Sequence, residues 1–120
     1  MCNMGGMSSS LGFWSVDPAT GALTYSSTAA DILGISGPHS PKLRDVLFRL
    51  YAADRQRLLR AGLASLKRRS TFDIVVLIRM PNGVRLLRVI GGAGYEVAQR
   101  DAHLHGVIEQ IALQEPRGVP

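Results

Sequence analysis

Two long apolar stretches joined by a Pro-Asn-Gly sequence constrain the fold of this chain more than any other feature. The segment FDIVVLIRMPNGVRLLRVIGG runs from Phe72 to Gly92. Asn and Gly tolerate the positive φ of tight turns, so Asn82-Gly83 predicts a β-hairpin with strands at 71–79 and 84–92. Because these strands carry apolar residues on both faces, each face of the sheet needs a cover.

Further strands and helices are predicted on either side of this hairpin. The segments 11–17 and 22–26 predict a first hairpin around Pro-Ala-Thr-Gly, and 103–112 predicts a last strand. The residues between them predict three helices: one capped by Ser26 or Ser27 and ending at Gly34, one beginning at Ser40-Pro41, and a long one over 53–67. This order predicts an α+β fold, a five-stranded antiparallel sheet with helices packed on one face.

The size and composition are those of one globular domain. The chain has 120 residues, of which 46% are hydrophobic, enough to bury a core. We expect a flexible leader over 1–10, the domain over 11–113 and a tail over 114–120. No apolar run reaches the roughly 18 residues that span a bilayer, and the first residues lack the pattern of a signal peptide. We therefore expect a cytoplasmic protein.

Basic residues are concentrated in one part of the chain. The formal net charge is +5, and seven of the basic residues lie between Arg49 and Arg69, with Asp54 as the one acid. At helical spacing, Leu58, Leu59, Leu63 and Leu66 form an apolar stripe, which leaves the basic residues for the solvated face. A nucleic-acid interface is the alternative, although the predicted helix has no aromatic residue on which a base could stack.

Four motifs follow one another along the chain. They are GFWSVDPATGALTYSSTAADILGI (12–35), YAADRQRLLRAG (51–62), FDIVVLIRMPNGVRLL (72–87) and HGVIEQIA (105–112). In this order they resemble the opening, the start of the long helix, the central hairpin and the last strand of the PAS domain, a sensor module of bacterial signalling proteins. In the second motif Asp54 and Arg55 match, and Tyr51-Ala52 stands in place of His-Pro.

The resemblance implies a cavity between the sheet and the long helix. Alternation along the strands assigns one row of side chains to the helix-covered face. The candidate pocket residues in these rows are Trp14, Val16, Val76, Ile78, Leu104 and Ile108. The alternative is that the same rows form a filled core.

The resemblance to the PAS family also bears on which cofactors this chain can hold. Flavin-adduct members of that family use a cysteine on a helix, and haem-binding members use a histidine on the long helix. Here the only cysteine is Cys2, in the leader, and residues 53–68 contain no histidine, so flavin-adduct and haem chemistry are not expected. His39 is predicted in a loop, and His103 and His105 share a strand face without a third ligand, so no metal site is expected. A small apolar or weakly polar metabolite is the ligand that we expect, if one binds.

The other face of the sheet also carries apolar residues. Val75 and Leu77 are predicted there, and Leu86 and Ile90 join them if the strand register allows. In the PAS family this surface is commonly covered by a helix or a second subunit, and the leader is a poor helix former. We therefore expect a homodimer through this face; the alternative is a modest exposed patch.

These observations favour a regulatory sensor module that is not itself an enzyme. The resemblance implies an effector, such as a histidine kinase or a diguanylate cyclase, in the same or a partner chain. Two other hypotheses are a nucleic-acid-binding module that uses the arginine-rich helix and a small α+β enzyme. An enzyme needs converging titratable groups, which the inward rows do not supply.

Overall fold

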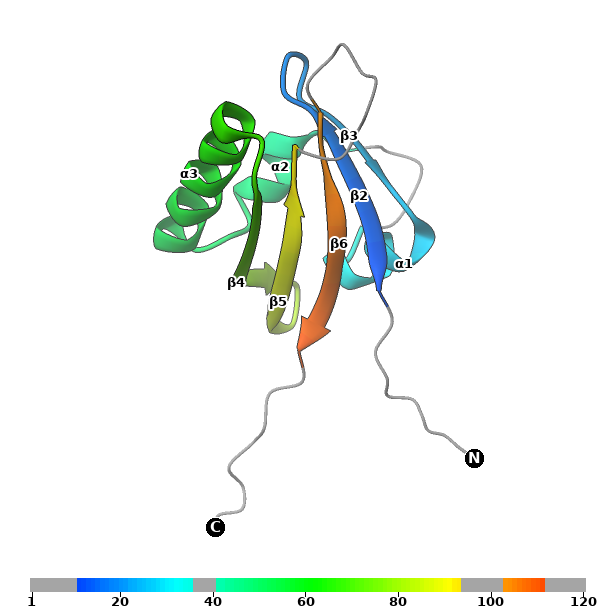
Figure 1. Cartoon of the computed structure of the whole chain (residues 1–120). Coiled ribbons are helices and arrows are strands. Elements are labelled where there is room, and N and C mark those ends of the chain that lie inside the picture. Colours follow the sequence, from blue (N-terminus) through cyan, green and yellow to red (C-terminus); the bar gives the residue numbers. More distant parts are fainter. Residues whose placement is uncertain (1–10, 36–40, 94–102, 112–120) are drawn as a thin grey trace, which may run out of the picture.

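A five-stranded antiparallel sheet forms the centre of the molecule. The computed structural model describes residues 11–35, 41–93 and 103–111. The strand order is β3-β2-β6-β5-β4, so β6 lies between the first and last hairpins and joins them (Figure 1). The predicted fold is therefore confirmed. The strands are β2 (Gly12–Asp17), β3 (Ala22–Tyr25), β4 (Thr71–Met80), β5 (Gly83–Gly92) and β6 (Leu104–Ile111).

The hairpin between β4 and β5 has a slightly different turn from the predicted one. Met80 pairs with Gly83, which makes Pro81 and Asn82 the two turn residues. Gly83 has a positive φ of 148°, whereas Asn82 does not have a positive φ. Proline fixes its own φ near the value that the first central residue of a common turn needs, so Pro81 starts the turn and the glycine follows it.

Three helices lie on one side of the sheet. They are α1 (Ser27–Leu33), α2 (Leu43–Leu47) and α3 (Ala52–Arg68). Figure 1 shows α1 near β2 and β3, and α3 beside the edge strand β4. The predicted start of the second helix is wrong: its N-cap is Lys42, whose N–H donates to Asp45 Oδ2 at 2.9 Å. Ser40 lies outside the described residues.

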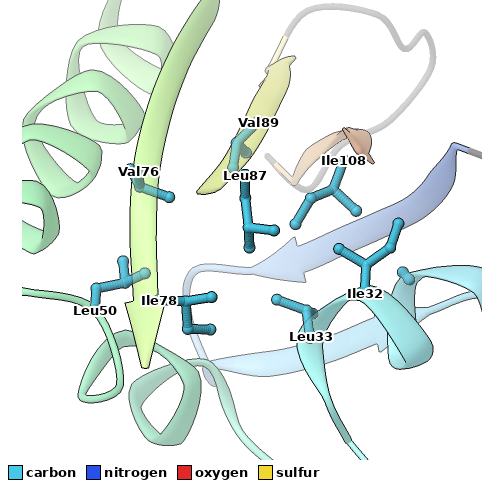
Figure 2. Packing of buried hydrophobic residues seen from close by; sticks show 9 residues of the cluster. Ile32, Leu33, Leu50, Val76, Ile78, Leu87, Val89 and Ile108 are labelled. Atoms are coloured by element: carbon cyan, nitrogen blue, oxygen red, sulfur yellow. The ribbon is translucent and has the colours of Figure 1, made fainter. Parts of the chain in front are cut away.

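The tightly packed core lies between α1 and the sheet. Ala29, Ile32 and Leu33 of α1 are buried, and they pack against the inner faces of the central strands and against Leu50. Figure 2 shows these side chains pointing into one interior. The strand residues in this cluster are Val76, Ile78, Leu87, Val89 and Ile108. Gly34, in the left-handed conformation with φ 71°, ends α1 as predicted.

The predicted leader and tail, residues 1–10 and 114–120, lie outside the described residues. Within the described part of the chain, no helix is both long enough and apolar enough to cross a bilayer.

Ser26 connects α1 to the first strand. Its Oγ accepts hydrogen bonds from the N–H of Ala29, at 3.2 Å, and from the N–H of Phe13, at 2.9 Å. The first bond caps the helix, and the second fixes the helix against β2. Of the two serines that the sequence offered as caps, the structure therefore selects Ser26.

We predict that Ser26→Ala lowers the free energy of unfolding by about 1 kcal/mol, because the helix loses its cap. The neighbouring Ser27 is exposed, and Ser27→Ala is the matched control, expected to change stability by less than about 0.5 kcal/mol. Urea unfolding followed by circular dichroism measures both. Equal losses in the two variants would contradict this role of Ser26.

Candidate functional site

An apolar cavity of about 240 Å³ lies between α3, α2 and the inner face of the sheet. Leucines of α3, together with Leu43 and Val46 of α2, form one wall, and the sheet forms the other. Every residue that lines the cavity is apolar or glycine, and none is titratable. The cavity can therefore bind an apolar molecule, but its lining offers no acid, base or nucleophile for catalysis.

Trp14 forms the floor of the cavity. On the inner face of the sheet, Trp14 of β2 lies opposite Gly106 of β6, which lies opposite Gly91 of β5. The indole crosses β6 and reaches Gly91, where a Cβ would lie 2.5 Å from the ring. The ring is held in place because Nε1 donates to the Val107 carbonyl at 3.0 Å.

Phe72 extends this floor toward the edge strand. The Phe72 ring stacks with Trp14, with centroids 6.3 Å apart and planes 25° apart. Because Gly91 and Gly106 contribute no side chain, the two aromatic rings have room to lie along the sheet. The strand pattern marked Trp14 as inward, but it gave no sign that two glycines make the space for it.

Most of the predicted pocket residues line this cavity. Trp14, Val16, Val76, Leu104 and Ile108 do so. Ile78 does not, because it is completely buried in the core, where β4 bridges to Leu50. Sequence reasoning missed the contribution of α2, whose Leu43, Val46 and Leu47 also line the cavity.

The N-terminal end of α3 is attached to the edge strand by polar contacts. The carboxylate of Asp54 accepts a hydrogen bond from the Leu77 N–H at 2.8 Å and pairs with Arg57 at 2.9 Å. Arg57 in turn donates to the Val75 carbonyl at 2.7 Å. The free backbone groups of an edge strand invite pairing with other chains, and here α3 satisfies two of them.

The C-terminal end of α3 is attached through Ser65, which is 1% exposed. Its Oγ accepts from the Ala93 N–H at 2.9 Å and donates to the Ser70 carbonyl. The residues of α3 buried against the rest of the fold are Gly62 and Ser65. Both ends of the helix are thus fixed by hydrogen bonds, while its middle faces the cavity.

The predicted leucine stripe of α3 is less buried than an amphipathic helix would suggest. Leu59 and Leu63 are 44% and 61% exposed, although both line the cavity. The orientation of the helix is set by Asp54 and Ser65, so the small residues meet the sheet and the leucines surround the open side of the cavity. Hydrophobic periodicity predicts that the leucines of α3, and not its glycine and serine, face the sheet. It therefore cannot reveal this orientation of the helix about its axis.

Two arginines have structural roles that the sequence analysis did not foresee: Arg49, from the basic cluster predicted to be solvated, and Arg85, which lies outside that cluster. Arg49 donates to the Arg79 carbonyl from Nη2 at 3.2 Å and from Nε at 3.3 Å. Arg85 donates to the carbonyls of Asp31 and Ile32, at 2.8 and 2.7 Å, where the C-terminal end of α1 carries partial negative charge. Burial, and then the charge of Arg85, lower the pKa of Arg49.

The strand register places all four predicted residues of the outer face on one surface. Leu77 lies opposite Leu86, Val75 opposite Arg88, and Ile90 opposite Asp73. Val75 is 38% exposed, and Phe13, on the same face of β2, is 61% exposed. We call this surface, which consists of Phe13, Val75, Leu77, Leu86 and Ile90, the outer apolar face.

An ion cluster crosses the outer apolar face. Arg88 makes a bidentate contact with Asp73, at 2.9 and 2.6 Å, and lies 3.8 Å from Glu109. The hydrogen bond from Arg88 lowers the pKa of Asp73. The contribution of the Asp73–Arg88 pair to stability is therefore fully present above the unfolded-state pKa of Asp73. It is lost as the pH falls through the lower folded-state pKa. Because these groups are exposed, that contribution is small.

His105 of β6 and His103, which immediately precedes the strand, lie on the outer side of the sheet, as predicted. His103 Nε2 is 3.8 Å from Asp17 Oδ2, and the rings of His103 and His105 are 6.3 Å apart. Among the described residues, no group of three or more His, Cys, Asp or Glu side chains could hold a metal ion. Cys2 and His39 lie outside the described residues.

Comparisons with known proteins identify similar folds. No protein-family model and no curated protein sequence matches the chain. A sensory box histidine kinase/response regulator from Burkholderia thailandensis E264 has 26% identity and a TM-score of 0.66, over 84% of this chain and 76% of that one.

Two more distant structures share the fold. The N-terminal domain of a diguanylate cyclase with a PAS/PAC sensor, from Marinobacter aquaeolei, has 12% identity and a TM-score of 0.67, over 82% of this chain and 93% of that one. A domain of a histidine kinase from Haloarcula marismortui has 17% identity and a TM-score of 0.70, over 88% of this chain and 93% of that one.

We predict that Asp54→Ala lowers the free energy of unfolding by about 2 kcal/mol, because it removes a charged acceptor from the Leu77 N–H and from Arg57. Asp31→Ala removes a carboxylate that makes no hydrogen bond or ion pair within the described part of the chain. This control is expected to stay within about 0.5 kcal/mol of the wild type in urea unfolding. If both variants lose the same stability, Asp54 does not anchor α3.

Proposed function

We propose that this chain, whose fold is that of PAS domains (also called sensory boxes), senses a small apolar ligand in the cavity beside α3. The module itself is not an enzyme in this proposal. An effector in the same or a partner chain would supply the output; the similar structures come from histidine kinases and a diguanylate cyclase, and these are the effectors that we propose.

The observation that carries the proposal is an apolar cavity, open on one side, between α2, α3 and the inner face of the sheet. Folded interiors leave few voids larger than a water molecule, and an apolar cavity of about 150 Å³ can bind benzene. The cavity here is about 240 Å³, so it has room for a ligand somewhat larger than one aromatic ring. The rings of Trp14 and Phe72 in the lining favour a molecule that can pack against an aromatic face.

The attachment of α3 suggests how the ligand would act. Its two ends are held by Asp54 and Ser65, whereas Leu59 and Leu63 are packed on one side only. A ligand that fills the cavity contacts these leucines and favours one position of the helix over others. A ligand shifts such an equilibrium only by its difference in affinity for the two states, and new contacts with α3 are the source of that difference.

We predict that bromobenzene, an apolar heavy-atom quencher, quenches the fluorescence of the single tryptophan in a saturable manner. Gly62 lies in the α3 wall of the cavity, where a Cβ would be 3.5 Å from Leu104. Gly62→Leu fills this space, and we expect it to weaken the saturable quenching about tenfold or more.

The control for this measurement is Ala64→Leu, which adds the same side chain on the exposed side of α3. Bromobenzene should quench the tryptophan fluorescence of this variant in the same saturable way as that of the wild type. Equal, non-saturable quenching in all three proteins would contradict binding in the cavity. Native mass spectrometry of freshly purified protein then identifies any molecule that the cavity retains during purification.

We further propose that the outer apolar face pairs with the same face of a second copy. Its apolar residues flank an ion cluster whose charges are already paired within one protomer. An ion without any partner is the costly case on burial. Here each charged group of the cluster has a partner, although one arginine lies between two carboxylates and the cluster keeps a net charge of −1. A two-fold interface uses the same surface on both subunits, and a sheet face with apolar rows suits that requirement.

We predict that the wild-type chain has the mass of a dimer in light scattering at high concentration and that Leu77→Glu converts it to a monomer. The glutamate would bring two unpaired carboxylates into the interface. Ala64→Glu adds the same charge on exposed α3 and should leave the dimer intact. A wild-type monomer at high concentration would refute pairing through this face.

A further inference from the structure

Two exposed aromatic rings, each covered by an arginine, lie where α2 leads into α3. Phe48 is 66% exposed, and the Arg55 guanidinium lies 5.4 Å from the centre of its ring. Tyr51 is 38% exposed, and the Arg79 guanidinium lies 4.5 Å from the centre of its ring. We call these four residues the arginine–aromatic surface. They do not line the cavity and are not part of the outer apolar face.

Backbone hydrogen bonds hold together the segments that carry the four residues. Arg79 N–H donates to the Arg49 carbonyl at 2.9 Å, so the end of β4 lies against the segment between Phe48 and Tyr51. Tyr51 is the N-cap of α3, and Arg55 N–H donates to the Tyr51 carbonyl at 2.8 Å. The surface is therefore held by the edge strand and by the first turn of α3.

The positive charge of this surface is not compensated locally. Within the described ranges, neither Arg55 nor Arg79 is paired with a carboxylate. The adjacent carboxylate, Asp54, is occupied by Arg57 and by the Leu77 N–H. Further positive charge lies close by on Arg49. A guanidinium that rests on a ring still presents N–H donors at its edge, and these match the two oxygens of a carboxylate.

From this arrangement we propose that the arginine–aromatic surface docks an acidic segment of a protein partner, whose Asp and Glu carboxylates pair with Arg55 and Arg79 while apolar atoms cover Phe48 and Tyr51. Arginine and aromatic residues are the types that contribute most binding energy in protein interfaces. A second copy of this chain does not suit the surface, because its nine Asp and Glu residues are scattered along the sequence and form no acidic segment.

Single-stranded nucleic acid is less suited than an acidic protein segment. Stacking of successive bases needs free ring faces along a track. Here there are two rings, and each has a guanidinium over one face. The inference is independent of the proposed ligand, because it uses no residue that lines the cavity.

The test is a fluorescence anisotropy titration with a labelled peptide of Asp and Glu residues separated by Gly and Ser. We expect Arg79→Ala and Phe48→Ala each to weaken binding about fivefold. Arg68→Ala removes the same charge from the other end of α3 and should weaken it less than about twofold. Thermal unfolding confirms that each variant is folded, and Arg79→Lys, which keeps the charge but loses the planar group, should be intermediate.

Three outcomes would overturn the proposal. Equal weakening by Arg68→Ala would show that only net charge attracts the peptide. Equal binding of a neutral Gly-Ser peptide would show that carboxylates are not recognised. Tighter binding of oligothymidine of the same length, lost in Arg79→Ala and Phe48→Ala, would assign the surface to nucleic acid instead.

Discussion

The pairing of β2 with β6 is the contact on which the rest of the structure depends. It brings a strand from the start of the domain against a strand from its end and makes one sheet from two hairpins. The same register sets Trp14 opposite Gly106 and in reach of Gly91. The sheet therefore has an aromatic floor at its centre, which lines the cavity beside α3.

The helices are attached to the sheet in two different ways. Helix α1 is held by apolar packing, with Ala29 fully buried and Ile32 and Leu33 nearly so. Helix α3 makes polar contacts near both ends, through Asp54 and Ser65, and packs Leu58 against the core cluster between them. Tight apolar packing resists displacement, since interiors are close-packed, whereas a helix fixed at two ends beside a cavity can respond to what fills it. In the proposed function, α1 would therefore serve stability and α3 would be the helix that responds to a ligand.

Local patterns in the sequence predicted the elements, their order and the sheet well, because turn residues, caps and strand alternation act over short distances. They also predicted which rows face inward, including Val76 and Ile108. These local patterns did not predict features that depend on contacts between residues far apart in the sequence. The rotation of α3 depends on Ser65 meeting Ala93, and the roles of Arg49 and Arg85 depend on carbonyls more than 25 residues away. The glycines beneath Trp14 carry no side chain for a pattern to detect.

The central claim is that the Trp14 ring lies across β6 against Gly91, as the floor of a cavity. Nuclear Overhauser spectroscopy on the folded protein measures this most directly. Strong cross-peaks from the six-membered ring of Trp14 to the α-protons of Gly91, with ring-current shifts of those protons, are the predicted result. Absence of these cross-peaks, with the indole instead close to the side chains of Leu59 and Leu63, would mean that Trp14 fills the space and that no such cavity exists.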